Sequence, residues 1–74
     1  MGKKGVLRAL GTELRRRREE LGLSQESLAG KAGVHLNTVG RIERGTYNPT
    51  VLMLGAIASI LSAELSEIFS AIGE

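Results

Sequence analysis

Three polar side chains that can hydrogen-bond to nucleic acid recur along one short segment of this chain. Asn37, Arg41 and Arg44 are spaced three or four residues apart, so on a helix that turns by about 100° per residue they share one face. Val39 and Ile42 point to the opposite side. Arginine pairs with guanine O6 and N7, and asparagine pairs with adenine N6 and N7. The spacing therefore predicts an exposed stripe suited to base edges and phosphates.

Gly40 lies between these side chains. A glycine inside a helix costs about 1 kcal/mol relative to alanine. A closer approach of the helix to a nucleic-acid groove would compensate for this cost, or the glycine is simply tolerated. The sequence leaves both interpretations open.

The chain lacks the side chains that most enzymes and metal sites require. It contains no Cys, no Asp and one His. A Ser-His-Asp triad is excluded, a zinc site is short of ligands, and no disulfide framework can form. We therefore expect a binding module that is not an enzyme, with no cofactor, no metal and no small-molecule ligand.

Positive charge is confined to the first part of the chain. All ten Lys and Arg lie within residues 1–44, which carry a net charge of +5, whereas residues 45–74 carry −3. A polyanion would bind to the positively charged first part. The same charge separation could also be a surface property without a binding partner. No signal peptide is visible, and the apolar stretch 51–61 is too short to span a bilayer. We expect a cytoplasmic protein without membrane contact.

Apolar residues at helical spacing, separated by glycines, predict five helices and no strand. The length allows one domain, which we expect over residues 6–74 after a flexible arm at residues 1–5. Ser24 and Thr50 are the expected N-caps of two helices. The expected helices cover about residues 6–21, 25–32, 36–44, 51–61 and 65–71.

The most specific stretch is residues 23–45, LSQESLAGKAGVHLNTVGRIERG. Two short helices joined by a tight turn at Gly33 predict a helix-turn-helix over about residues 25–44. The small side chain of Ala29 lets the two helices approach closely. Together these features are more specific than any one residue.

Three segments, LRRRREELGLSQESLA, AGVHLNTVGRIERG and NPT…LGAIASIL, resemble the phage repressor/Cro (XRE-like) helix-turn-helix family in order and spacing, and the likeness runs over roughly residues 10–69. The resemblance implies an all-α, five-helix fold with the helix-turn-helix at its centre. It implies sequence-specific binding of double-stranded DNA, with the third helix in the major groove. The implied function is transcriptional regulation, by a repressor that binds a near-palindromic operator as a homodimer.

The resemblance also implies roles for individual residues. Leu36, Asn37 and Arg41 would contact bases. Eight others would contact the DNA backbone: Ser24, Gln25, His35, Thr38, Arg44, Thr46, Tyr47 and Asn48. In relatives, the residue at the position of Gln25 also braces the reading helix.

Three of these roles stay open. Leu36 departs from the polar residues common in the family, and would touch a thymine methyl group or pack on the turn. His35 would contact a phosphate or cap the third helix. Tyr47 would contact a phosphate or pack with its hydroxyl in water.

The four arginines at residues 15–18 resemble a nucleic-acid patch. Glutamates at i,i+4 spacing instead predict a solvated helix face, with the pairs Glu13–Arg17, Arg15–Glu19 and Arg16–Glu20. Arg18 differs, because relatives pair an arginine at its position with a glutamate that matches Glu43. The resemblance thus implies a structural salt bridge between the first and third helices.

The predicted fourth helix is apolar on two faces. Leu54, Ile57, Ala58 and Leu61 form the stripe that relatives bury. The opposite face carries Leu52, Met53, Ala56 and Ile60. An apolar patch left in water usually marks an interface, although this patch could instead cover the C-terminal tail of the chain. We expect the dimer interface to contain Leu52, Met53, Ala56, Ile60, Ile68 and Ile72.

Three rival functions remain. A restriction-modification controller or an antitoxin could use the same fold. A protein-interaction module could have lost DNA binding, but Gln25, Asn37, Arg41 and Arg44 argue against it. An RNA binder would need a stacking platform, and the chain has only one Tyr and one Phe.

Overall fold

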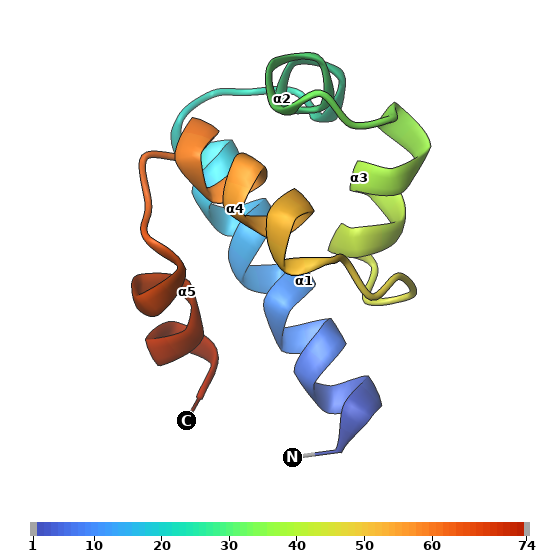
Figure 1. The fold of residues 1–74 in the computed structure, drawn as a ribbon, viewed down its shortest axis with the longest axis vertical. Helices are drawn as coiled ribbons and strands as arrows, with labels where there is room; N and C mark the ends of the chain where they lie inside the picture. The colour runs from blue at the N-terminus through green and yellow to red at the C-terminus, as the bar shows by residue number, and fades with distance from the viewer. Residues whose placement is uncertain (1, 74) are drawn as a thin grey trace.

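Five α-helices make up the regular secondary structure of residues 2–73, the part of the chain described by the computed structural model. They are α1 (Lys3–Glu20), α2 (Gln25–Ala32), α3 (Leu36–Glu43), α4 (Val51–Ile60) and α5 (Leu65–Ile72). Helix α1 contacts α3 and α5, while α4 contacts α2 and α5. Figure 1 shows α3 on one side of α1, α5 on the other, and α2 across the top of the molecule. The predicted all-α, five-helix fold is confirmed.

Apolar side chains from all five helices meet in one core. Its fully buried members include Leu14, Leu28, Val39, Ile42, Ile57 and Ile68. The predicted inner stripe of α4 is part of this core, as is Ala29 between α2 and α3. Ile68 has no exposed surface, so its assignment to the dimer interface is wrong. The side chain faces inward because α5 packs against both α1 and α4.

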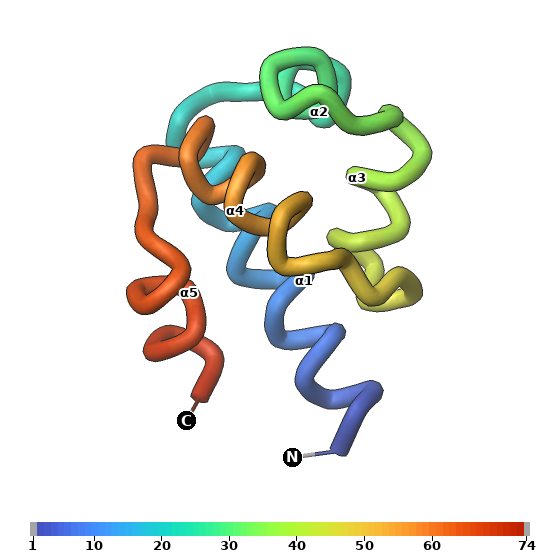
Figure 2. Tube along the Cα trace, viewed as in Figure 1, coloured from blue at the N-terminus to red at the C-terminus, as the bar shows by residue number. Residues whose placement is uncertain are grey.

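Helix α1 begins earlier than the sequence predicts. Residues 3–5 are helical, so the expected flexible arm is wrong for them; Met1 lies outside the described residues. The Val6 N–H donates to the Gly2 carbonyl at 2.9 Å, which closes the first turn. Lysine is a good helix former, so one glycine at position 5 does not stop the helix. The first turns of α1 therefore extend past the end of α3, as the trace in Figure 2 shows.

Local capping positions the other helices. The Ser24 hydroxyl accepts from the Ser27 N–H at 2.9 Å, and the Thr50 hydroxyl accepts from the Met53 N–H at 3.1 Å. Both N-caps were predicted from the sequence. Gly33 ends α2 with φ of 72°, a conformation that glycine adopts without strain. This turn directs the chain from α2 into α3.

Helices α1 and α3 touch backbone to backbone at Gly11. A Cβ atom there would lie 2.6 Å from the Glu43 carbonyl oxygen and would also overlap the Ile42 carbonyl, so only glycine fits. Just beyond α3, a Cβ on Gly45 would lie 2.8 Å from the Arg8 Cα. The two glycines let α1 pack directly against the end of α3. The sequence analysis did not anticipate this contact.

No single helix among residues 2–73 is long and apolar enough to cross a membrane. Helices α4 and α5 reach the required length and composition only as a pair that is bent by 99°.

Candidate nucleic-acid interface

The outward face of α3 borders an open hollow of about 390 Å³. Leu36, Asn37 and Arg41, the predicted base-contacting residues, are all exposed and line it. Val39 and Ile42 on the opposite face are buried in the core. The structure thus brings the predicted reading residues together on one free surface.

The hollow is completed by residues from both helices of the helix-turn-helix. Gln25 reaches it from the start of α2, and Arg44 from the end of α3. A Cβ on Gly40 would lie 3.2 Å from Arg44 Nη1 and 3.7 Å from Gln25 Oε1. Gly40 is therefore buried under these two side chains, and its lack of a side chain leaves room for them.

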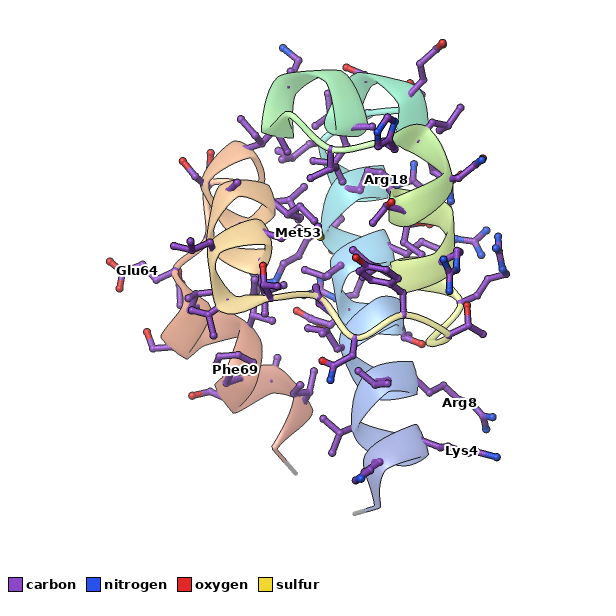
Figure 3. The ribbon with its side chains drawn as sticks, turned by 45° about the vertical axis from the view of Figure 1, so that its right-hand side comes forward. Lys4, Arg8, Arg18, Met53, Glu64 and Phe69 are labelled. Atoms are coloured by element: carbon purple, nitrogen blue, oxygen red, sulfur yellow. The ribbon has the colours of Figure 1, made fainter. Side chains whose placement is uncertain are left out.

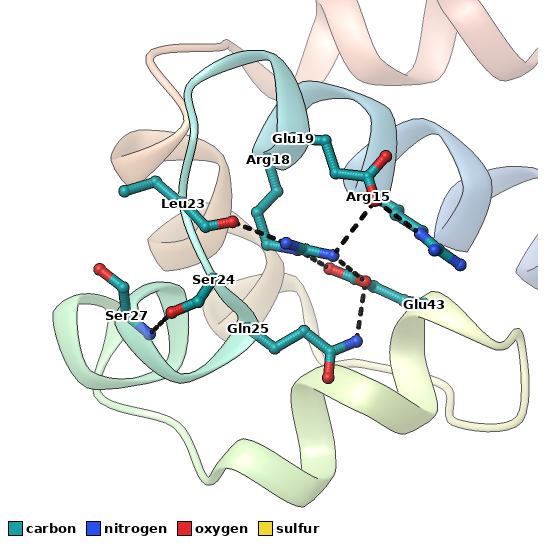
Figure 4. A network of polar contacts seen from close by, with 8 residues as sticks. All are labelled: Arg15, Arg18, Glu19, Leu23, Ser24, Gln25, Ser27 and Glu43. Carbon is teal, nitrogen blue, oxygen red and sulfur yellow. Dashed lines mark hydrogen bonds and ion pairs between the residues drawn. The ribbon is translucent and has the colours of Figure 1, made fainter.

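A buried ion pair joins α1 to α3, as the family resemblance implied. Arg18 Nε lies 2.7 Å from Glu43 Oε2, and the two side chains are 9% and 4% exposed. Arg18 also donates to the Leu23 carbonyl at 2.6 Å. Hydrogen bonding to Glu43 raises the pKa of Arg18, although burial opposes it. Figure 4 shows this network linking the end of α1, the segment before α2 and the end of α3.

Gln25 belongs to the same network. Its Nε2 atom donates to Glu43 Oε1 at 3.0 Å, which braces α3 against the start of α2. An amide nitrogen carries two hydrogens, so one remains for a ligand outside the protein. One side chain can thus hold α3 in place and still donate to an acceptor outside the protein.

The loop after α3 supports Arg41. Its guanidinium carbon lies 5.1 Å from the centre of the Tyr47 ring, a distance typical of a cation–π contact. The Thr46 N–H and hydroxyl both donate to the Arg41 carbonyl, at 2.9 and 3.2 Å. Tyr47 itself is half-buried and packs against the core. The ring therefore serves as a packing residue and as a platform for the arginine.

The remaining predicted backbone-contacting residues do not line the hollow. Ser24 is exposed, but its hydroxyl oxygen already caps α2. His35 precedes α3, is exposed, and makes no side-chain capping bond, so its capping role is not observed. Thr38 is half-buried on α3, while Asn48 is exposed in the loop before α4.

Comparison with known proteins identifies the family. The helix-turn-helix (HTH_3, XRE-type) family model matches residues 14–68. The chain belongs to the XRE-like helix-turn-helix family of DNA-binding transcription regulators.

The family's named relatives are regulators. An HTH-type transcriptional regulator of Methanothermobacter thermautotrophicus is 41% identical over 59 residues, covering 78% of this chain and 86% of the relative. The restriction-modification controller protein C.AhdI of Aeromonas hydrophila is 38% identical with a TM-score of 0.83, covering 85% of this chain and 96% of that one. The clp gene regulator ClgR of Corynebacterium glutamicum has the same fold, with a TM-score of 0.88 and 24% identity over 92% of this chain and 72% of that one.

In this family member the arginine run on α1 is neutralised by glutamates. Arg15 contacts Glu19 at 3.1 Å, Arg17 contacts Glu13 at 2.6 Å, and Arg16 bonds to both Glu13 and Glu20. All three predicted i,i+4 pairs are present. Hydrogen bonding to Arg16 holds the pKa of Glu13 below its ordinary value, against the opposing effect of burial.

The apolar surface of α4 is only partly free. Leu52 is 87% exposed and Val51 73%, and Phe69 on α5 is 47% exposed. Four residues of the predicted interface, Met53, Ala56, Ile60 and Ile72, are half-buried. Figure 3 labels Met53 on α4 and Phe69 on α5. The exposed apolar surface is thus centred on the start of α4.

Proposed function

We propose that this regulator is a repressor that binds a near-palindromic site in double-stranded DNA as a homodimer. The observation that carries the proposal is the exposed stripe Leu36–Asn37–Arg41 on a helix held by a buried ion pair. Helices of this kind enter the major groove, where each base pair presents a distinct pattern of donors and acceptors.

In the proposed complex, Asn37 and Arg41 hydrogen-bond to base edges. Leu36, which is 45% exposed, lies against an apolar atom such as a thymine methyl carbon. Arg44 holds a phosphate from the far end of α3. Because Val39 on the opposite face of α3 is buried in the core, only the exposed face of α3 can enter the groove.

Phosphates on either side of the groove contact the two flanking segments. The second Nε2 hydrogen of Gln25 donates to one strand, where the first amides of α2 add favourable dipoles. Exposed Asn48 donates to the other strand, and Thr46 does so when its hydroxyl hydrogen turns from the Arg41 carbonyl to a phosphate. His35 and Thr38 add further backbone contacts at the start of α3, and the Ser24 and Tyr47 hydroxyls remain free to donate. Such contacts position a protein on DNA without reading its sequence.

The proposed dimer forms through Leu52, with Met53, Ala56, Ile60 and Ile72 at its margin. Burying a leucine side chain contributes roughly 1.5–3 kcal/mol. Two copies would present their α3 helices to successive major grooves, about 34 Å apart. We also propose that the protein acts in the cytoplasm, without catalytic activity.

Selection of bound duplexes from a random pool tests this proposal. We expect enrichment of two half-sites related by a two-fold axis, with centres one helical turn apart. Enrichment of a single half-site would contradict the dimer. No enrichment at all would contradict sequence-specific binding.

A second candidate is control of a restriction-modification system, favoured by the 38% identity to C.AhdI. It uses the same DNA-binding face and differs in the genes that are controlled. Restriction and methyltransferase genes beside the coding sequence, with the selected site in their promoter, would favour this candidate over a general repressor.

A further inference from the structure

The net positive charge of residues 1–44 comes from a small set of cations. The four arginines at 15–18 are matched by Glu13, Glu19, Glu20 and Glu43. Among residues 2–73, the cations that form no ion pair are Lys3, Lys4, Arg8, Lys31, Arg41 and Arg44. Half of these cations lie in the first two turns of α1, outside the helix-turn-helix.

The packing of α1 brings two of them to the DNA-binding side. Arg8 lies beside the loop after α3, because the space of a Gly45 side chain is filled by the Arg8 backbone. Lys4 is one turn earlier, about 40° around the helix and about 6 Å along it. Figure 3 shows both side chains extending toward the side on which α3 lies.

These cations are held in place and are accessible. Lys4 and Arg8 are exposed, on a helix whose backbone is fixed against α3 at Gly11. They precede residue 14, where the match to the family model begins.

We propose that Lys4 and Arg8 bind phosphates of double-stranded DNA beyond those that the helix-turn-helix reaches. The proposal rests on the proposed function, because α3 must sit in the groove to bring α1 to the backbone. DNA carries one charge per about 1.7 Å of its axis. Lys4 and Arg8 are separated by about 6 Å along α1, so each cation has a phosphate within reach.

The test is the salt dependence of binding to the selected duplex and to a mixed-sequence duplex of the same length. Each lost phosphate contact makes the negative slope of log Kobs against log salt concentration shallower by about 0.9. We expect the slope to become shallower by about 0.9 for Arg8→Ala and by about 1.8 for Lys4→Ala/Arg8→Ala, equally on both duplexes. Arg16→Ala is the matched control, since it removes the same charge from the same helix at a position paired with glutamates.

Ethylation interference then locates the contacts. Phosphates outside the helix-turn-helix footprint should block wild-type binding when ethylated, and have no effect on the double variant. Circular dichroism of both proteins checks that α1 stays helical.

Three results would overturn the proposal while leaving the proposed function intact. The first is an unchanged slope in the double variant. The second is an equal change of slope for Arg16→Ala. The third is a loss of affinity that is confined to the selected duplex. Failure of the wild type to bind either duplex would overturn the proposed function itself.

Discussion

Arg41 is both a candidate base reader and a partner of Tyr47. Its side chain lines the hollow of α3 while its guanidinium lies over the ring. We predict that Arg41→Ala weakens binding to the selected site by about 1–3 kcal/mol and relaxes specificity at one base pair. Competition binding against single-base variants of the site measures both effects. An equal loss on every sequence would make Arg41 a phosphate contact instead.

Tyr47 should act on specificity through Arg41. We predict that Tyr47→Leu, which keeps an apolar side chain against the core, reduces discrimination between the selected and mixed duplexes. The expected loss is about 0.5–1 kcal/mol, the strength of an exposed cation–π contact. Tyr47→Phe keeps the ring and should retain discrimination. If the Phe and Leu variants lose discrimination equally, the hydroxyl is the important group and the stack is not; if both retain it, the stack on Arg41 does not contribute to specificity.

Residue positions followed from sequence only where helical periodicity fixes them. The angle between Asn37 and Arg41 is a property of any α-helix, so their common exposure could be predicted. The stack of Arg41 on Tyr47 depends on the path of the loop after α3, which no periodic pattern encodes. Gly11 was overlooked because, within a helical pattern, the carbonyls that exclude a side chain come from a segment about thirty residues away.

At the level of helices, the Arg18–Glu43 pair should stabilise the packing of α1 against α3. We predict that Arg18→Met or Glu43→Gln alone lowers the free energy of unfolding by about 3–5 kcal/mol, because each leaves a buried partner uncompensated. The double variant should cost less than the sum of the two. Denaturant unfolding of all four proteins measures the coupling, and additive effects would show that the pair does not interact.

The glutamate–arginine pairs on α1 should make stability depend on acid. Because hydrogen bonding to Arg16 lowers the pKa of Glu13 from its ordinary 4.5, ionised Glu13 stabilises the fold above that unfolded value. This contribution is lost as the pH falls through the lower folded pKa. Wild type should therefore be more stable than Glu13→Gln near neutral pH, and the difference should vanish once the pH has fallen below the lowered pKa of folded Glu13. A difference that stays constant across this range would contradict the assignment.

Helix boundaries were predictable where the signals are local. Ser24 and Gly33 delimit α2 by capping and by turn geometry, so its range was predicted correctly. The start of α1 was not, because Lys3 and Lys4 favour a helix but Gly5 suggests its end. Helix α1 continues through Gly5, and its following turns pack against α3 and α5. These two helices are distant in sequence, so local signals around Gly5 do not reveal the packing.

For the whole molecule, the exposed start of α4 predicts self-association. We expect wild type to sediment as a dimer and Leu52→Glu as a monomer, because a charge would replace the most exposed apolar side chain of the patch. Leu21→Glu, at a leucine that is 51% exposed at the end of α1, is the matched control and should stay dimeric. Wild type that remains monomeric at high concentration would contradict the dimer.

The side chains with aromatic rings are few and lie on different segments of the chain. The chain has one Tyr, one Phe, one His and no Trp, so the aromatic region of its proton NMR spectrum contains three spin systems. The Tyr47 ring stacks against the Arg41 guanidinium, His35 precedes α3, and Phe69 lies exposed on α5. A titration with DNA should shift the Tyr47 and His35 resonances, whereas dilution of the free protein should shift those of Phe69. In an isotope-filtered spectrum of labelled protein, which removes the overlapping base protons of the DNA, these three rings can thus follow binding and self-association separately.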